Sequence, residues 1–306
     1  MKLSAYLFSS SISTDLIVNN IYSIINGDFV LASEARLLIS DLALQRGYGI
    51  FDFFRTVNNQ PLFMEDHLDR FYQSATTMHM SAAVERQALR KMILQLIEKN
   101  SLPDAGIRIT LTGGYSKDGY TLGQPNLLIT QNAFSFNRDN FYSGISLVTY
   151  DHQRQLPNVK TIDYLHAIFL QPFIKENHAD DVLYYHDKEI TECPRANFFI
   201  VTKKDEVITP AKNILKGITR KKILGLPGFN FKEAAIEPAF VKEVKEAFIT
   251  STTRSVLPVL KLNGDLIGSG KPGEITTAIF QKLLAYQEQE SVNTHRNQPI
   301  EKEFRD

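Results

Sequence analysis

A polar, irregular stretch at residues 132–143 (NAFSFNRDNFYS) constrains the fold most, because it separates two segments that each mix strand-like and helix-like hydrophobic patterns. Alternating apolar residues predict strands, and apolar residues spaced at i, i+3 and i+4 predict helices. The chain has 306 residues, whereas a typical domain has about 100–200. We therefore expect a two-domain α+β (α/β) protein with domains at residues 1–131 and 144–290, a linker at 132–143, and a polar tail at 291–306.

The first domain is expected to begin with a tight hairpin. Asn26-Gly27 separates two apolar runs, and this pair suits a tight turn because both residues accept positive φ. The predicted elements are hairpins at 22–30 and 51–63, helices at 65–77 and 83–99, and strands at 106–112 and 126–130.

The second domain is expected to contain many short strands and three helical segments. Pro172 should bend its helix or start a second one, since proline has no backbone N–H to donate. The predicted elements are strands at 145–150, 182–186, 190–192, 196–202, 206–209, 243–250 and 258–262, and helices at 164–175, 219–224 and 274–289.

Charge, cysteine content and hydropathy exclude several classes of protein. Lys+Arg and Asp+Glu each total 34, so the chain lacks the basic character of a nucleic-acid binder. The single cysteine, Cys193, excludes a disulfide framework and a thiolate-rich metal site, and we expect no metal. No apolar run approaches the ~20 residues of a membrane helix, and the apolar start at residues 3–8 is too short for a signal peptide. We expect a cytoplasmic protein.

Five segments combine residue types that are suited to cofactor chemistry. They are residues 45–75 (QRGYGIFDFFRTVNNQPLFMEDHLDRFYQSA), 156–165 (LPNVKTIDYL), 190–200 (ITECPRANFFI), 215–220 (LKGITR) and 249–258 (ITSTTRSVLP). In this order they resemble the fold-type IV, or class IV, pyridoxal-phosphate aminotransferases, a family that includes branched-chain aminotransferase, D-amino-acid aminotransferase and aminodeoxychorismate lyase. The resemblance extends from about Tyr22 to Tyr286. It implies a smaller N-terminal α/β domain, a larger C-terminal domain with a mixed, barrel-like sheet, bound pyridoxal phosphate and a homodimer.

The resemblance also assigns roles to the catalytic residues. Lys160 would form a Schiff base with the cofactor and move a proton, which a lysine can do where burial and cationic neighbours lower its pKa. Glu192 would pair with the pyridine nitrogen, and Tyr164 would hydrogen-bond the ring hydroxylate. Asn197 would support the loop that carries Glu192.

Three sets of donors are expected to hold the cofactor phosphate. Arg70, at the end of the His-x-x-Arg motif, offers a charged fork. Ile218 and Thr219 stand where a helix is predicted to begin, so that backbone N–H groups point at an anion. Thr252 adds its hydroxyl group and Thr253 its backbone N–H.

Arginine and aromatic residues of the first domain are the candidates for substrate binding. Arg55 and Arg108 alternate with apolar neighbours on predicted strands, so either is expected to bind a substrate carboxylate. Phe51, Phe53 and Tyr48 are expected to line an apolar pocket, which favours a hydrophobic or branched-chain L-amino acid.

The alternatives within the family differ in one loop. D-amino-acid aminotransferases carry an Arg-x-His pair after the glycine that Gly114 matches, whereas this chain has YSKDGYT at residues 115–121. A tyrosine of the branched-chain enzymes is replaced by Gly106, and an arginine of the lyase loop by Asp118, which disfavours an aromatic dicarboxylate. We predict an aminotransferase; the alternatives are a D-amino-acid aminotransferase, an aminodeoxychorismate lyase and a non-catalytic pyridoxal-phosphate-binding member.

Overall fold

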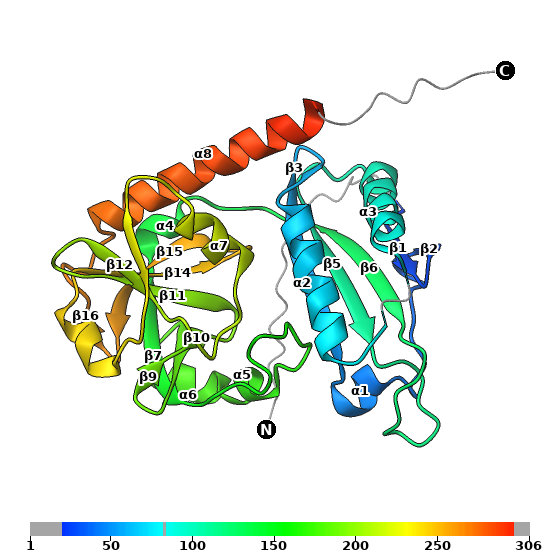
Figure 1. Ribbon diagram of the computed structural model, residues 1–306, viewed down its shortest axis with the longest axis horizontal. Coiled ribbons are helices and arrows are strands. Elements are labelled where there is room, and N and C mark those ends of the chain that lie inside the picture. Colours follow the sequence, from blue (N-terminus) through cyan, green and yellow to red (C-terminus); the bar gives the residue numbers. More distant parts are fainter. Residues whose placement is uncertain (1–19, 82–83, 297–306) are drawn as a thin grey trace, which may run out of the picture.

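The computed structural model describes residues 20–81 and 84–296, which form two units packed side by side (Figure 1). The first unit is built on a six-stranded antiparallel sheet with the order β2-β1-β6-β5-β3-β4. Its elements are β1 (Tyr22–Ile25), β2 (Asp28–Leu31), α1 (Leu42–Arg46), β3 (Gly49–Val57), β4 (Gln60–Pro61), α2 (Met64–Thr77), α3 (Arg86–Asn100), β5 (Ala105–Thr112) and β6 (Leu127–Ala133).

Helices α2 and α3 cover one face of this sheet, as Figure 1 shows. Ile50 and Phe54 of β3 pack in the same core cluster as Leu68 and Phe71 of α2, so the even-numbered residues of β3 face the helices. Because side chains alternate along a strand, the odd-numbered residues of β3 face the second unit. Phe51, Phe53 and Arg55 therefore lie on the face of the sheet that is turned to the second unit.

The second unit is built on a ten-stranded mixed sheet that curls into a half-barrel. Its main path is β13-β12-β11-β14-β15-β7-β8-β9, with β10 paired to β11 and β16 to β15. The strands are β7 (Ile145–Asp151), β8 (Asp181–His186), β9 (Glu189–Ile190), β10 (Glu192–Cys193), β11 (Ala196–Val201), β12 (Glu206–Thr209), β13 (Asn230–Glu233), β14 (Glu246–Ser251), β15 (Ser255–Leu262) and β16 (Asp265–Leu266). The helices are α4 (Asn140–Ser143), α5 (Leu165–Phe169), α6 (Gln171–Glu176), α7 (Ile218–Leu224), the 3-10 helix η1 (Pro238–Glu243) and α8 (Glu274–Arg296).

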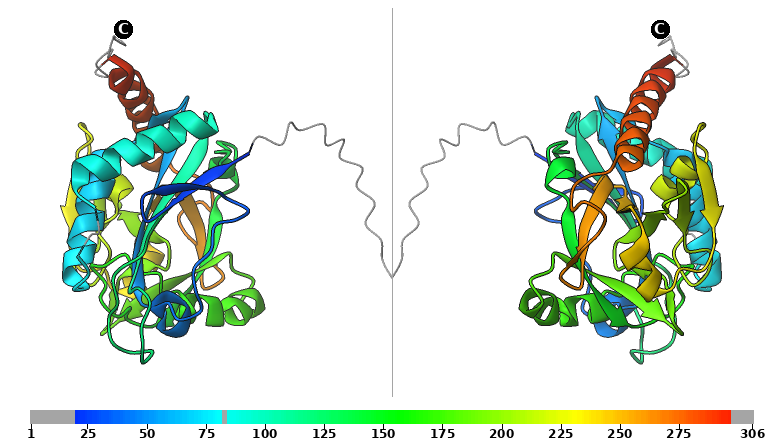
Figure 2. Two further views of the ribbon diagram at one scale, coloured as in Figure 1. Left: turned by 90° about the vertical axis from the view of Figure 1, so that its right-hand side faces the viewer. Right: turned by 90° about the vertical axis from the view of Figure 1, so that its left-hand side faces the viewer.

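Contacts from α2, α7 and α8 join the two units. Lys221 and Lys222 of α7 both pair with Asp66 of α2. Tyr286 of α8 lies against Phe63, with ring centroids 5.4 Å apart. Figure 2 shows α8 running obliquely along the second unit, and α1, α5 and α6 lying together at the opposite end of the molecule. Within the described residues, no helix is long and apolar enough to cross a bilayer.

The predicted fold class is confirmed: a smaller unit of helices on a sheet precedes a larger unit with a mixed, barrel-like sheet. The hairpin at Asn26-Gly27 forms with both residues at positive φ, and Pro172 lies in the first turn of a second helix, α6. The sequence patterns did not predict α1, β13 or η1. Ala83, the predicted start of the second helix, lies outside the described residues.

The predicted linker and tail are more ordered than expected. Strand β6 extends to Ala133 and α4 occupies Asn140–Ser143, which leaves residues 134–139 as the irregular part. Helix α8 continues to Arg296, although 291–306 was expected to be a frayed tail, because neither glycine nor proline interrupts the chain between Gly273 and Pro299. Residues 297–306 lie outside the described part of the chain.

Candidate active site

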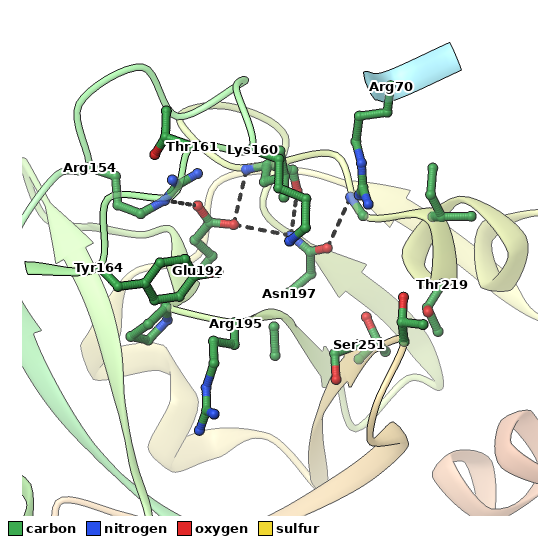
Figure 3. A pocket seen from close by; sticks show the side chains of 17 residues that line it. Arg70, Arg154, Lys160, Thr161, Tyr164, Glu192, Arg195, Asn197, Thr219 and Ser251 are labelled. Carbon is green, nitrogen blue, oxygen red and sulfur yellow. Dashed lines mark hydrogen bonds and ion pairs between the residues drawn. The ribbon is translucent and has the colours of Figure 1, made fainter. Parts of the chain in front are cut away.

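A cavity between the two units gathers side chains from segments far apart in the sequence (Figure 3). Arg70 enters from α2, whereas the other lining residues come from loops, strand ends and the start of α7 in the second unit. The cavity is lined by these predicted site residues: Arg70, Lys160, Tyr164, Glu192, Ile218, Thr219 and Thr252. The structure thus brings most of the predicted cofactor set together around one space.

Lys160 lies in an extended segment that pairs with the start of β3. The backbone N–H of Phe51 donates to the carbonyl of Lys160 at 2.9 Å, and the N–H of Ile162 donates to the carbonyl of Gly49 at 3.0 Å. The Lys160 Nζ lies 4.5 Å from the centre of the Phe51 ring. Burial, followed by the charges of Arg70 and Arg154, lowers the pKa of Lys160 to about 7. With this pKa, about half of the Lys160 amines are neutral at pH 7 and can act as a nucleophile or base.

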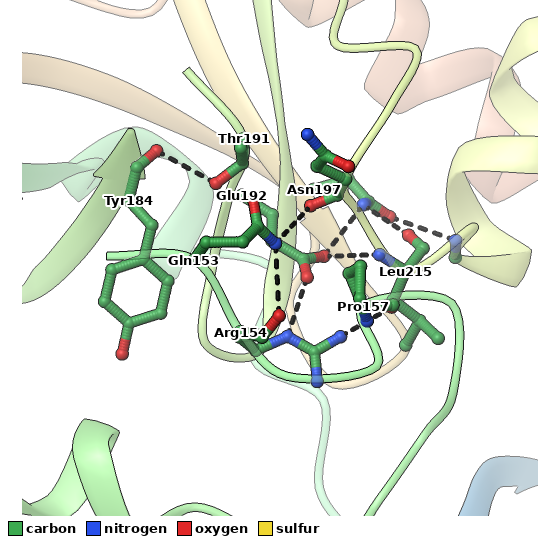
Figure 4. A network of polar contacts seen from close by, with 10 residues as sticks. Gln153, Arg154, Pro157, Tyr184, Thr191, Glu192, Asn197 and Leu215 are labelled. Atoms are coloured by element: carbon green, nitrogen blue, oxygen red, sulfur yellow. Dashed lines mark hydrogen bonds and ion pairs between the residues drawn. The ribbon is translucent and has the colours of Figure 1, made fainter. Parts of the chain in front are cut away.

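Glu192 is held in a network of charged and amide groups (Figure 4). Its Oε1 accepts from Arg154 Nε at 2.8 Å, and its Oε2 accepts from the Leu215 backbone N–H at 3.0 Å. Asn197 lies opposite Glu192 in the β10–β11 pairing. Its side-chain N–H group donates to Glu192 Oε2 at 3.5 Å and to the Leu215 carbonyl at 2.7 Å. Burial raises the pKa of Glu192, while Arg154 opposes that shift. Asn197 therefore lies where it can fix the Glu192 loop.

The Arg70 guanidinium is oriented by a buried carboxylate. Its Nε and one terminal nitrogen donate to the two oxygens of Asp52, each at 2.8 Å, and His67 Nδ1 lies 2.6 Å from Asp52 Oδ1. His67 and Arg70 are three residues apart on α2 and so share a face of the helix. Burial alone would raise the pKa of Asp52, but Arg70 and His67 hold it well below its usual range.

The side of the cavity near Arg70 is rich in hydrogen-bond donors. Gly217 stands at the N-cap of α7, so that the N–H groups of Ile218 and Thr219 are at the start of the helix. Ser251 and Thr252, at the end of β14, add hydroxyl groups to the same cavity. Together with Arg70 these groups suit an anion such as phosphate.

The family model described as amino-transferase class IV matches residues 49–262 of this chain. The chain is 28% identical to D-alanine aminotransferase of Bacillus licheniformis, covering 85% of this chain and 96% of that protein. It is also 28% identical to D-alanine aminotransferase of Staphylococcus aureus (strain N315), covering 88% and 98%.

Solved branched-chain aminotransferases share the fold. The enzyme of the thermophilic archaeon Thermoproteus uzoniensis, solved with norvaline, is 20% identical with a TM-score of 0.80, over 90% of this chain and 97% of that one. The Escherichia coli enzyme is 21% identical with a TM-score of 0.79, over 89% and 95%. The chain belongs to the class IV aminotransferases.

This aminotransferase family uses pyridoxal phosphate, and the side chains present fit that group. The fit rests on an amine with a pKa of about 7, a buried carboxylate at Glu192, and the donors around Arg70, all lining one cavity. The fold-type IV assignment and the assignment as an aminotransferase are therefore established for this chain.

The predicted substrate residues are divided between the two faces of the sheet and the two ends of β3. Phe51 and Arg108 lie near Lys160, since the Arg108 guanidinium is 3.8 Å from the centre of the Phe51 ring. The Phe53 ring covers Gly106, where an added Cβ would lie 2.5 Å from the ring. The Tyr164 ring lies 6.1 Å from that of Phe51, and burial raises the pKa of Tyr164.

None of the predicted substrate residues lines the cavity itself, and neither does Thr253. Tyr48 donates from its hydroxyl to the Met78 carbonyl at 2.7 Å, on the side of the sheet that the helices cover. Arg55 shares the face of Phe51 but lies four residues along β3, where it contacts Gln287 of α8. The chain turns at the end of β14, so that Thr253 lines a different groove. Thr250, Ser251 and Thr252, which precede it, line the cavity.

Asp52 and Arg154 were missed by sequence reasoning. Each forms its ion pair with a residue 18 or more positions away in the chain, Arg70 and Glu192 respectively. A single sequence offers no pattern for such pairs, although an aspartate within the apolar run of β3 is a signal of a buried polar role.

Proposed function

We propose that this aminotransferase moves an amino group from a hydrophobic or branched-chain L-amino acid to a 2-oxo acid, with Lys160, Glu192 and Tyr164 as catalytic residues. The single observation that carries the proposal is the Lys160 amine, with a pKa of about 7, in the cavity that Glu192 and Arg70 also line. When bound, pyridoxal phosphate supplies a carbonyl carbon that an amine can attack and a ring that withdraws electrons from the substrate Cα.

Each residue has a role that its surroundings support. Lys160 would hold the cofactor and then carry a proton to and from the substrate Cα, since its amine is readily deprotonated near pH 7. Glu192, fixed by Arg154, would keep the ring nitrogen protonated, and the Tyr164 hydroxyl would donate to the ring oxygen. Arg70 would bind the phosphate as a fork that Asp52 orients.

The remaining phosphate donors come from the second unit. Ile218 and Thr219 would donate backbone N–H groups, and Thr252 its hydroxyl. Arg70 lies opposite the start of α7, so that a doubly charged phosphate would be held from two sides, by the Arg70 guanidinium and by the donors of the second unit.

For the substrate, we propose that Arg108 binds the carboxylate and that Phe51 and Phe53 form the apolar wall. The Arg108 guanidinium lies over Phe51, the ring that also contacts Lys160 Nζ. The loop at 115–121 (YSKDGYT) contains no arginine that could bind a D-amino acid, and it is folded around Asp118, which accepts bonds from Ser116, Tyr120 and Thr121. D-Alanine is a second candidate donor, favoured by the D-alanine aminotransferases at 28% identity.

The purified protein should show an absorption band with pyridoxal phosphate, and L-leucine should bleach it. A Lys160→Ala variant should lose the band, and Arg108→Met should raise KM for the donor, whereas Arg138→Met, an exposed arginine on the linker, should change neither. Bleaching by D-alanine but not by L-leucine would transfer the assignment to D-amino acids. Pyruvate released from aminodeoxychorismate without an acceptor would instead favour the lyase.

We also propose a homodimer. Helices α1 and α5 and the loop before α1 lie at the same end of the molecule (Figure 2), and they carry exposed apolar side chains. They are Leu38, Ile39, Leu44, Leu165, Ile168 and Phe169, each more than 60% exposed. Patches of this kind mark association surfaces. Light scattering should give twice the mass of the 34.7 kDa chain, and a Phe169→Glu variant should give the monomer.

A further inference from the structure

Arg55, which was expected to bind substrate, lies in a second cavity between the two units. This cavity has a volume of about 570 Å³, within the range of about 300–1,000 Å³ that is usual for small-molecule sites. The end of β3, the segment after β6 and helix α8 line it, and it shares no lining residue with the Lys160 cavity. Whatever occupies it therefore does not occupy the aminotransferase site.

The Arg55 guanidinium is buried without the partner that buried arginines usually have. The residue is 5% exposed, and its one hydrogen bond within the described part of the chain goes to Gln287 Oε1 at 3.3 Å. By contrast, Arg70 and Arg220 each donate to a carboxylate, at 2.8 and 2.6 Å. A guanidinium has five N–H donors, so that most of those on Arg55 have no acceptor among the residues that the structure describes.

Aromatic rings surround the same guanidinium. Its central carbon lies 4.6 Å from the Phe136 ring centre and 5.6 Å from that of Phe134. Asp104 also lines the cavity, but it accepts from the Asn58 backbone N–H at 3.3 Å and forms no ion pair with Arg55 among the described residues. Burial lowers the pKa of Arg55 to about 10 although Asp104 opposes this, so the charge is incompletely compensated.

We propose that this cavity binds a small monocarboxylate with a flat apolar body. The free N–H groups of Arg55 would bind the carboxylate in a bidentate pair, and the body would lie against Phe134 and Phe136. A doubly charged anion is disfavoured because Asp104 places a carboxylate at the same cavity, whereas the Glu288 carboxylate is paired at 3.0 Å with Arg138, which also lines the cavity. The arginine edge and the aromatic wall thus select for one negative charge and an apolar remainder.

A ligand at this position would touch both units. Arg55 belongs to β3 of the first unit, and Gln287 and Glu288 belong to α8 of the second. The same strand carries Phe51 beside Lys160, four residues before Arg55. The site is therefore placed to act as an effector site that stabilises the contact between the units.

Titration of the full-length protein with 4-fluorobenzoate, followed by fluorine NMR, tests the proposal without any need for turnover. Binding with a Kd below about 10 mM is expected, and Arg55→Met should weaken it about tenfold or more, since one charge-assisted pair is lost. Arg90→Met, an exposed arginine on α3, is the matched control and should leave the Kd unchanged. Arg108→Met separates this site from the aminotransferase site.

Absence of binding, or binding that Arg108→Met abolishes and Arg55→Met leaves intact, would overturn the proposal. Near-ultraviolet circular dichroism shows whether Arg55→Met is folded. If it is not, Phe136→Ala decides: a loss of affinity of about tenfold supports the site, and an unchanged Kd refutes it. Because the readout is direct binding, the result does not depend on whether the proposed aminotransferase assignments hold.

Discussion

The clearest quantitative expectation concerns the amine of Lys160 in protein prepared without cofactor. Burial, then Arg70 and Arg154, lowers its pKa to about 7, whereas an exposed lysine has a pKa of about 10.4. At pH 7, about half of the Lys160 amines should be neutral, against roughly one in 2,500 for an exposed lysine. The neutral form is the nucleophile, so this difference is the advantage that the site confers.

Trace labelling with acetic anhydride between pH 5 and 11, followed by peptide mass spectrometry, measures this pKa directly. The labelling of Lys160 should rise with a midpoint near 7, while surface lysines in the same digest serve as internal standards with midpoints near 10. Arg70→Met removes the largest charge effect and should raise the midpoint, whereas Arg90→Met should not. A Lys160 midpoint near 10, or one that Arg70→Met leaves in place, would refute this account of the site.

The same shift makes stability depend on pH. Between pH 7 and 10.4 the unfolded state binds more protons at Lys160 than the folded state does, so that the free energy of unfolding should rise with pH in this window. The slope is at most about 1.4 kcal/mol per pH unit. Urea titrations at pH 7 and 9 should show the rise in the cofactor-free protein and its loss in Lys160→Met.

Three further substitutions test the groups around the lysine. Asp52→Asn should lower the free energy of unfolding, measured by urea titration at pH 7, by about 3–5 kcal/mol, since it leaves the buried Arg70 guanidinium unpaired. This loss should shrink as pH falls below about 4, because the lowered pKa of Asp52 stabilises the fold fully only above that pH. Arg154→Met should raise the pKa of Glu192 further, so that the rise of activity with pH moves to higher pH; an unchanged pH–rate profile would contradict this. Gly217→Ala would place a Cβ 2.3 Å from Asn197 Oδ1. This clash should weaken pyridoxal-phosphate binding about tenfold in a fluorescence titration, whereas an unaltered affinity would show that Asn197 can move freely.

The sequence predicted those spatial relations between residues that depend on local spacing. His67 and Arg70 lie one helical turn apart, and Glu192 and Asn197 face each other across a short hairpin, so that their relations follow from the element that carries them. The start of α7 was likewise predicted within one residue from the LKGITR segment. Local geometry of this kind is independent of how the two units pack.

The substrate residues were predicted less well because β3 is buried on both faces. Most of its residues from Gly49 to Val57 are buried, so the sequence shows no alternation that tells one face from the other. Position along the strand mattered as well: Phe51 lies beside Lys160, and Arg55, on the same face, lies beside α8. Only the packing of the two units decides which part of β3 meets the lysine.

This packing also explains how α2 and α7 would form one phosphate-binding surface under the proposed function. Asp66 and Arg70 are four residues apart on α2, so they share a face of that helix. Asp66 pairs with Lys221 and Lys222, and these lysines lie within one turn of the N–H groups at the start of α7. The ion pairs therefore set the separation between Arg70 and those N–H groups, although none of the paired side chains needs to touch the phosphate. An anion bound between α2 and α7 gains its donors from both units, so its affinity depends on the contact that holds the units together.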